Sequence, residues 1–345
     1  MARAVPRSRS SAIRLDLQPT LPLDRTPSPE ISSAAHDVGW SPWRAVPGAT
    51  PLSAAVLSET LDGGQAFRWR RDADGNWLGL FDRNAVRLRL SPDETLNWSA
   101  PAGLVANTEP ALIRYLDTGP RLAALVDALP WRSDPHLARC IAAFPGLRIL
   151  RQPFGETLLG FLCSATKQIV QIKQMIALLA ERHGAPLLPS TETASDSTNA
   201  AFAAAANSSL SRLPTWTELA EVPESDLRAC LLGFRARYIH QTARFIAANP
   251  GWLEATEQLP YAEAKERLCS LPGVGEKVAD CVLLFGAGRL EAFPVDVWMI
   301  KAMAARYGLA GWKPAQIAHF GRTHFGAGAG LAQQYLFAWE RGFGR

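Results

Sequence analysis

Residues 271–277 read LPGVGEK, and Asp296 follows Lys277 by nineteen positions within PVDV at 294–297. Two glycines one residue apart, between two helical patterns, predict a tight turn that exposes backbone N–H groups at a helix N-terminus. Such a terminus attracts anions, so a phosphate is the expected ligand. Lys277 falls in the first helical turn, where the helix dipole disfavours an ammonium ion, and Asp296 is a carboxylate able to share its proton. The stretch therefore predicts phosphate binding beside a nucleophilic lysine.

Each of these features also has an ordinary structural interpretation. Glycines serve any tight turn between helices, a helical lysine usually lies in solvent, and Asp296 fits the N-cap of the apolar helical pattern after it. The hairpin interpretation is favoured because apolar residues line one face of both flanking helical patterns, so the two helices are expected to pack together. For Asp296 the two roles are compatible, since a capping carboxylate can face a cleft.

The composition bounds the class of protein. With 345 residues, 48% of them hydrophobic, the chain can bury a large core in two or three packed units. A formal net charge of +4 permits nucleic-acid binding without requiring it. The five scattered cysteines form no CxxC pair, which argues against zinc, iron–sulfur and disulfide frameworks and indicates a reducing compartment. No apolar run reaches membrane-spanning length.

The patterning divides the chain into three regions. Residues 1–38 are rich in Pro, Ser and Arg, and we expect a disordered basic tail there, with a weak transit peptide as the alternative. Residues 39–130 are predicted as an antiparallel β domain with one solvent-exposed face. Residues 131–345 are predicted as a helical domain, with a low-complexity insertion at 186–211. The period-2 stretches lie at 67–70, 77–81 and 86–90.

Beyond about residue 103 the hydrophobic period lengthens towards 3.6, which is typical of helices. The fold class predicted from the whole pattern is α+β, with a small β domain leading into a larger helical one. The expected helices lie at 108–118, 133–144, 156–165, 168–183, 216–222, 224–232, 235–248, 260–271, 275–286, 297–307, 314–325 and 329–341.

Several separated segments together resemble the helix–hairpin–helix DNA glycosylase superfamily, and specifically its 8-oxoguanine DNA glycosylase/AP-lyase family. The resemblance implies a TBP-like N-terminal β domain followed by an HhH-GPD glycosylase domain. The segments that carry it are LPGVGEKVADC at 271–281, PVDV at 294–297, GQAFRW at 64–69, ILRQ at 149–152, LGFRARY at 232–238 and the last helix at 332–337.

The resemblance implies excision of 8-oxoguanine from duplex DNA, followed by strand cleavage. Lys277 would attack the sugar C1′ as the base departs, and the resulting imine would permit β-elimination. Asp296 would accept or share the lysine proton and stabilise positive charge on the sugar. The nucleotide must be flipped out of the duplex to be reached. The hairpin residues Gly273, Val274 and Gly275 would bind the DNA backbone.

The same resemblance assigns a base pocket. Phe337 would stack on one face of the flipped base, Cys281 would contact the other, and Gln333 would hydrogen-bond the Watson–Crick edge. The Gly64 carbonyl would accept the N7–H of 8-oxoguanine. Guanine has a lone pair at N7 and would leave that carbonyl unpaired, at a cost of about 1–3 kcal/mol.

The chain departs from the family pattern where the family contacts the base opposite the lesion. Thr166 stands at the position of an Asn and Gln171 replaces the first of two arginines, whereas Arg235 retains the second. Because a planar amide and a guanidinium are lost, we expect weaker discrimination among opposite bases. Trp298 replaces a common His, and Phe234 replaces a wedging Tyr, although an apolar ring can still unstack a base step.

Two other functions fit parts of the pattern. A monofunctional glycosylase for alkylated bases typically keeps the aspartate without the lysine, so Lys277 argues against it. A non-catalytic DNA-binding hairpin module would need neither Asp296 nor the helix with Gln333 and Phe337.

The expected partner is damaged duplex DNA, and we expect a monomer with no membrane association. Neither a metal nor an organic cofactor is expected, with a structural monovalent cation at the hairpin carbonyls as an option. A bacterial cytosol or nucleoid is the preferred location, and a nucleus or organelle is expected if the chain is eukaryotic.

Overall fold

The computed structural model describes residues 39–188 and 210–344. The expected tail at 1–38 and most of the expected insertion at 186–211 lie outside these residues. The insertion's flanks are paired, because Pro186 and Ser211 form an antiparallel bridge and the Leu187 amide donates to the Leu210 carbonyl over 2.8 Å. No helix in the described part of the chain is long and apolar enough to cross a membrane.

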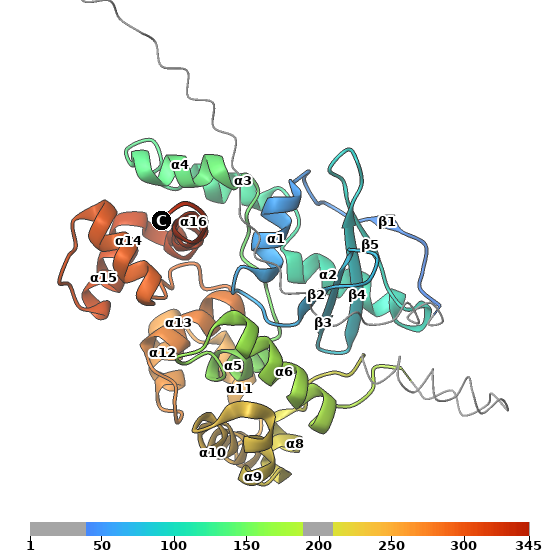
Figure 1. Cartoon of the computed structure of the whole chain (residues 1–345). Coiled ribbons are helices and arrows are strands. Elements are labelled where there is room, and N and C mark those ends of the chain that lie inside the picture. The colour runs from blue at the N-terminus through green and yellow to red at the C-terminus, as the bar shows by residue number, and fades with distance from the viewer. Residues whose placement is uncertain (1–38, 189–209, 345) are drawn as a thin grey trace, which may run out of the picture. The chain divides into compact units, whose positions relative to one another are not determined.

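The N-terminal part contains a five-stranded antiparallel sheet in the order β1-β5-β4-β3-β2 (Figure 1). Alternating apolar residues and tight turns produce these strands, as the period-2 pattern predicted. An α+β fold with this sheet preceding a mostly helical part confirms the predicted fold class. The strands are β1 Arg44–Ala45, β2 Trp69–Arg71, β3 Trp77–Phe81, β4 Asn84–Leu90 and β5 Leu96–Ser99.

One face of the sheet carries large aromatic side chains into the core. Trp69 is buried, and its indole N–H donates to the hydroxyl of Tyr115 over 3.0 Å. Tyr115 lies on helix α2 Val105–Leu116. Gly79 pairs with Trp69 across the strands, and a Cβ at Gly79 would lie 2.4 Å from the indole ring. The glycine therefore makes room for the tryptophan.

The opposite face of the sheet is not the solvent-exposed surface that we predicted. Leu78 and Leu80 on β3 are only 6% exposed, because Leu210 packs on them together with the half-buried Leu187 and Leu188. The flanks of the insertion thus cover this face, a long-range contact that strand periodicity does not reveal.

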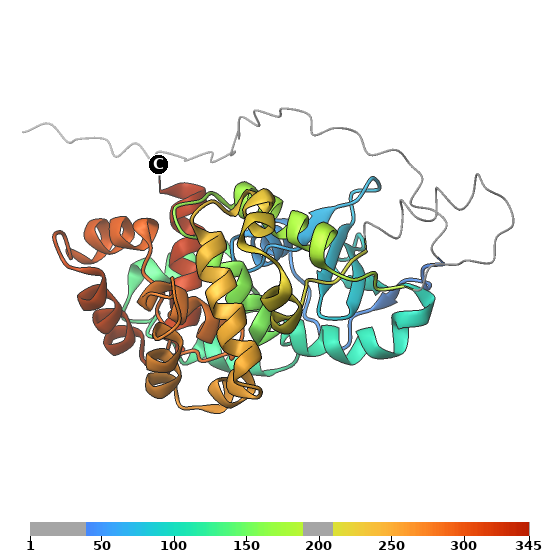
Figure 2. The same cartoon turned by 90° about the horizontal axis from the view of Figure 1, so that it is seen from below.

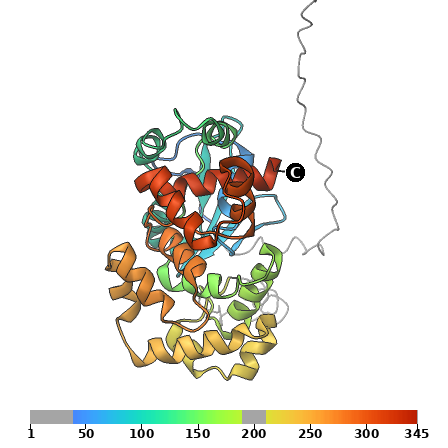
Figure 3. The ribbon, with the colours of Figure 1, turned by 90° about the vertical axis from the view of Figure 1, so that its left-hand side faces the viewer.

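The helices of the second part lie close to the predicted ranges. Figures 1 and 2 show α5 and α13 between the sheet and α15. Figure 3 shows α12 and α13 between the α14–α16 group and the α8–α10 group. The helices are α4 Pro135–Ala143, α5 Phe154–Leu162, α6 Ile169–His183, α8 Trp216–Glu221, α9 Glu224–Leu227, α10 Arg235–Ala248, α12 Tyr261–Cys269, α13 Glu276–Phe285, α14 Val297–Tyr307, α15 Pro314–Phe325 and α16 Ala329–Phe343, with short 3₁₀ turns η2 Ala102–Leu104 and η4 Gly326–Gly328.

The structure corrects the helix assignment in two ways. Three short helices were not expected: α1 Ala54–Asp62, which lies inside the predicted β region, α3 Arg121–Asp127 and α11 Trp252–Gln258. They span nine residues or fewer, too few turns for a clear helical period. The single helix expected at 224–232 instead ends in a π-helical turn, η3 Arg228–Leu232, where Leu231 has φ +62°.

Candidate functional site

The hairpin at 271–277 joins α12 to α13, as predicted, and its two glycines have different surroundings. Gly273 has φ +78°, and a Cβ there would lie 2.5 Å from the ring of Tyr238 on α10. Gly275 is the N-cap of α13, and nothing lies within 4 Å of a Cβ built on it. Val274 between them is buried. The hairpin is therefore seated on Tyr238 through Gly273, while its surface at Gly275 is open to a ligand.

Lys277 lies in the first turn of α13, half-buried above an aromatic ring. Its Nζ is 5.2 Å from the centroid of the Phe161 ring on α5. Cys281, one turn later, is 4% exposed. Burial raises the pKa of the Cys281 thiol to about 11, opposed by the charge of Lys277 and a hydrogen bond from it. The thiol is therefore a neutral, apolar neighbour of the lysine at physiological pH.

Asp296 is the N-cap of α14, as the sequence predicted. Its Oδ1 accepts the backbone N–H of Met299 over 2.9 Å. The negative charge of Asp296 also acts to raise the pKa of the Cys281 thiol, after burial as the main cause. Lys277 and Asp296 thus have opposite effects on the pKa of the same buried thiol.

Two exposed apolar side chains follow Asp296 on the surface. Val297 is 66% exposed and Trp298 is 40% exposed. The Nζ of Lys301 lies 5.5 Å from the centroid of the Trp298 ring. Trp298 therefore presents an aromatic surface beside the site, where a histidine would have offered a hydrogen bond.

The candidate base-reading amide is held by its own neighbours. Gln333 on α16 is 3% exposed, and its Nε2 donates to the Pro294 carbonyl over 3.3 Å. Its Oε1 accepts from Nε2 of Gln334 over 2.7 Å. An amide has two donors and two acceptor sites, so one of each remains for a ligand. Because Pro294 precedes Asp296 by two residues, the bond to Pro294 joins α16 to the segment at the N-terminus of α14.

Gly64 and Phe337 lie against each other, as the base-pocket assignment requires. Gly64 has φ +103°, and a Cβ built there would lie 3.9 Å from Cε1 of Phe337 and 3.3 Å from Cδ1 of Ile169. Phe337 is half-buried on α16. A glycine is needed at this point because the backbone conformation excludes most side chains.

Two further residues position this pocket, and sequence reasoning did not single them out. The Gln65 side chain donates to the Arg148 carbonyl over 2.9 Å and accepts the Leu150 amide over 3.0 Å, which ties the Gly64 segment to the start of the helical domain. Arg341 donates to the Gly63 carbonyl and lies 5.6 Å from the Phe337 ring. Gln65 stands inside the quoted GQAFRW motif, and Arg341 follows Phe337 by four residues, one helical turn.

Arg235 brings together part of the predicted opposite-base surface. Its guanidinium lies 4.3 Å from the Phe234 ring centroid and donates to the Thr166 hydroxyl over 2.9 Å and to the Ala165 carbonyl. Burial lowers the pKa of Arg235 from its usual value. Phe234 is 51% exposed and meets Tyr238 edge-to-face at 6.0 Å between ring centroids.

Gln171 has a structural contact within its own helix. Its Oε1 accepts the Gln168 amide over 3.2 Å in a capping box at the start of α6. A side chain engaged in a helix cap does not replace a free guanidinium as a donor to a base.

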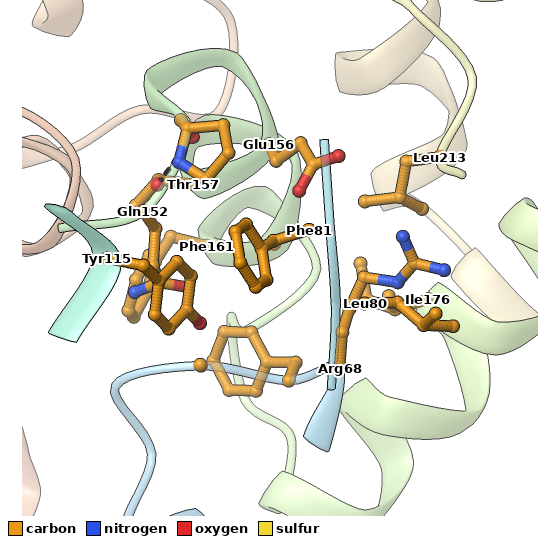
Figure 4. A pocket seen from close by; sticks show the side chains of 14 residues that line it. Arg68, Leu80, Phe81, Tyr115, Gln152, Glu156, Thr157, Phe161, Ile176 and Leu213 are labelled. Carbon is orange, nitrogen blue, oxygen red and sulfur yellow. Dashed lines mark hydrogen bonds between the residues drawn. The ribbon is translucent and has the colours of Figure 1, made fainter. Parts of the chain in front are cut away.

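The cavity in Figure 4 lies behind Phe161 and has a volume of about 20 Å³, enough for one water molecule. Arg68, which directly precedes β2, and Glu156 on α5 both line this cavity. Burial lowers the pKa of Arg68 and raises that of Glu156, whose Oε1 accepts the Asp82 amide over 3.0 Å. This mostly apolar cavity is too small for a base.

Across the residues that the structure describes, no group of three or more His, Cys, Asp or Glu side chains is placed to hold a metal ion.

Two family models match the chain in sequence order. The N-terminal domain of 8-oxoguanine DNA glycosylase matches residues 49–158, and the HhH-GPD superfamily base excision DNA repair protein matches residues 162–321. Among curated relatives, the Arabidopsis thaliana N-glycosylase/DNA lyase OGG1 is 30% identical over 333 residues, covering 92% of this chain and 86% of its own length. The Saccharomyces cerevisiae N-glycosylase/DNA lyase is 28% identical over 276 residues, covering 74% and 69%.

A solved structure agrees with these relatives. The Clostridium acetobutylicum 8-oxoguanine glycosylase/lyase, in complex with double-stranded DNA containing cytosine opposite 8-oxoguanine, is 31% identical with a TM-score of 0.72. The match covers 84% of this chain and 92% of that one. The resemblance inferred from the motifs is confirmed: the chain belongs to the 8-oxoguanine DNA glycosylase family of the HhH-GPD superfamily.

Proposed function

We propose that this chain excises 8-oxoguanine from duplex DNA and cleaves the strand at the resulting abasic site, as a bifunctional glycosylase and lyase. The observation that carries the proposal is the placement of Lys277 in the first turn of α13, over the Phe161 ring, with Asp296 at the N-cap of the following helix α14. Its close relatives are named N-glycosylase/DNA lyase, and the lysine is the group that the second activity requires.

In the proposed reaction, the amine of Lys277 forms a bond to C1′ while the glycosidic bond breaks, and the base departs with that bond's electron pair. Asp296 takes the proton that the amine loses and stabilises positive charge on the sugar. Loss of the ring oxygen from C1′ gives an imine, which makes the C2′ proton acidic, and β-elimination then expels the 3′ phosphate. The polarised helix N-terminus at Gly275 is suited to bind a backbone phosphate.

Base recognition rests on groups that are already positioned. The Gly64 carbonyl accepts the N7–H that distinguishes 8-oxoguanine from guanine, and Phe337 stacks on the base. Gln333 offers its remaining donor and acceptor to the Watson–Crick edge, because Pro294 and Gln334 use one of each and hold the amide in orientation. Cys281, kept protonated by burial, contacts the other face.

We further propose that the chain acts as a monomer on damaged duplex DNA, in the cytosol or nucleoid if the protein is bacterial. All five cysteines are free thiols, which supports a reducing compartment. A monovalent cation at the hairpin carbonyls stays a prediction.

Borohydride trapping tests the central step. Reduction during incubation with an 8-oxoguanine duplex is expected to give a covalent protein–DNA adduct, which Lys277→Gln abolishes together with strand cleavage. Lys313→Gln, which changes an exposed lysine at the start of α15, is the matched control and should trap normally. Base release without an adduct would instead indicate the monofunctional glycosylase, and neither product would indicate a binding module; both results contradict the proposal.

The two roles of Asp296 can be separated by substitution. Asn caps a helix as well as Asp does, so Asp296→Asn should keep the thermal stability of the protein while slowing single-turnover excision by about 100-fold or more. Asp296→Ala should in addition lose about 1 kcal/mol of stability, because the Met299 amide loses its acceptor. Unchanged excision by Asp296→Asn would show that the carboxylate only caps α14.

Excision opposite C, A, G and T tests the altered opposite-base surface. We expect the four rates to lie within about tenfold of one another, because Gln171 is engaged in a helix cap and Thr166 lacks an amide. Thr166→Asn should raise the preference for cytosine, since Asn supplies a forked amide and tolerates the local φ of +56°. A strong cytosine preference in the wild-type protein would contradict this account.

A further inference from the structure

Two bulky residues adopt backbone conformations that usually belong to glycine. Thr166 has φ +56° and Leu231 has φ +62°, with ψ 15° at Leu231. The other non-glycine residues with positive φ in the described part of the chain are two aspartates and Glu94. Left-handed backbone is costly for bulky and β-branched residues, and such strain gathers at functional sites. These two positions therefore require an explanation.

Three arginines hold the Leu231 turn in place by binding its carbonyl groups. Arg182 donates to the Ala229 carbonyl over 2.9 Å and Arg228 donates to the Gly233 carbonyl over 3.3 Å. Arg235 donates to the Leu232 carbonyl over 3.2 Å. Both direct neighbours of Leu231, Cys230 and Leu232, are fully buried. The surroundings thus determine the strained conformation without help from the Leu231 side chain.

The Leu231 side chain is 59% exposed, so it gains little from packing within the protein. Glycine would adopt the same backbone without strain, and asparagine would do so at little cost. A leucine at this point is destabilising for the free protein. The side chain is explained if it is buried only when a partner is bound.

Contacts join the turn to residues predicted to meet the DNA, through the buried Arg235. Arg235 binds the Leu232 carbonyl with one nitrogen and the Thr166 hydroxyl with another, which joins the two strained turns. The guanidinium also lies over Phe234, which contacts Tyr238, on which the hairpin's Gly273 is seated. A continuous set of contacts therefore runs from the catalytic hairpin to Leu231.

The chemistry of this surface fits opened duplex DNA. Leu231 and Phe234 are 59% and 51% exposed. Arginine side chains surround the turn, including Arg182 and Arg228. Arg228 also pairs with Glu224 over 2.6 Å, whereas Arg182 has no ion pair within the part of the chain that the structure describes. Apolar side chains beside an arginine suit a base step that has lost its stacking, with phosphates at its sides.

We propose that Leu231 is a second apolar wedge, which enters the DNA beside Phe234 and packs against the base left unpaired opposite the lesion. The inference rests on the proposed function. Packing against an apolar side chain does not depend on which base is present. The leucine would therefore hold the unpaired base even though positions 166 and 171 lack the forked hydrogen-bond donors of the family.

Leu231→Gly tests the proposal because stability and binding should change in opposite directions. Without DNA, its Tm should rise by roughly 2 °C as the strain is relieved. Its Kd for a duplex with a tetrahydrofuran abasic analogue opposite cytosine should weaken roughly tenfold, the loss expected for one buried leucine side chain. Leu231→Asn, which keeps the turn conformation but is polar, should weaken binding to a similar extent.

Glu94→Gly is the matched control, because Glu94 has φ +61° in the exposed turn between β4 and β5. It should raise Tm similarly and leave Kd unchanged. Unchanged DNA binding by Leu231→Gly, full binding by Leu231→Asn, or a lower Tm for Leu231→Gly would each overturn the wedge. Failure of the proposed function is distinct, since the wild-type protein would then release no 8-oxoguanine.

Discussion

The position of Lys277, the proposed nucleophile, depends on the contact between the Gly273 backbone and the ring of Tyr238. No Cβ fits between them, so the hairpin sits directly on α10. This contact fixes the start of α13 and with it Lys277, which lies over Phe161. It also sets the place of Phe234, since Tyr238 touches both the hairpin and that exposed ring. One glycine–tyrosine contact thus positions both Lys277, proposed to attack the sugar, and Phe234, proposed to distort the DNA.

Helix termini position Lys277 and Asp296, the proposed reacting groups, whereas buried hydrogen bonds position Gly64 and Gln333, the groups proposed to read the base. Asp296 caps α14 and Gly275 caps α13, so local backbone geometry sets the N-terminal ends of both helices. The pocket depends instead on long-range bonds, from Gln65 to the segment before α5 and from Gln333 to Pro294. Substitutions of these buried amides should therefore impair recognition even though they touch no reacting atom.

The sequence predicts the elements with strong local signals and fails where tertiary contacts decide. The helices at 235–248, 297–307 and 314–325 match α10, α14 and α15 to the residue, because apolar periodicity and caps mark them. The covering of Leu78 and Leu80 depends on residues more than a hundred positions away. The left-handed turn at Leu231 depends on three arginines, and no propensity of leucine indicates it.

The proposed reaction requires a covalent bond between Lys277 and the DNA sugar during turnover. Peptide mapping of the borohydride-trapped complex can locate this bond. The chain has six lysines, at positions 167, 173, 265, 277, 301 and 313, so a proteolytic digest can assign the adduct. We expect mass spectrometry to find the reduced sugar remnant on the peptide containing Lys277. An adduct on another lysine or on the N-terminal amine would contradict the proposed reaction.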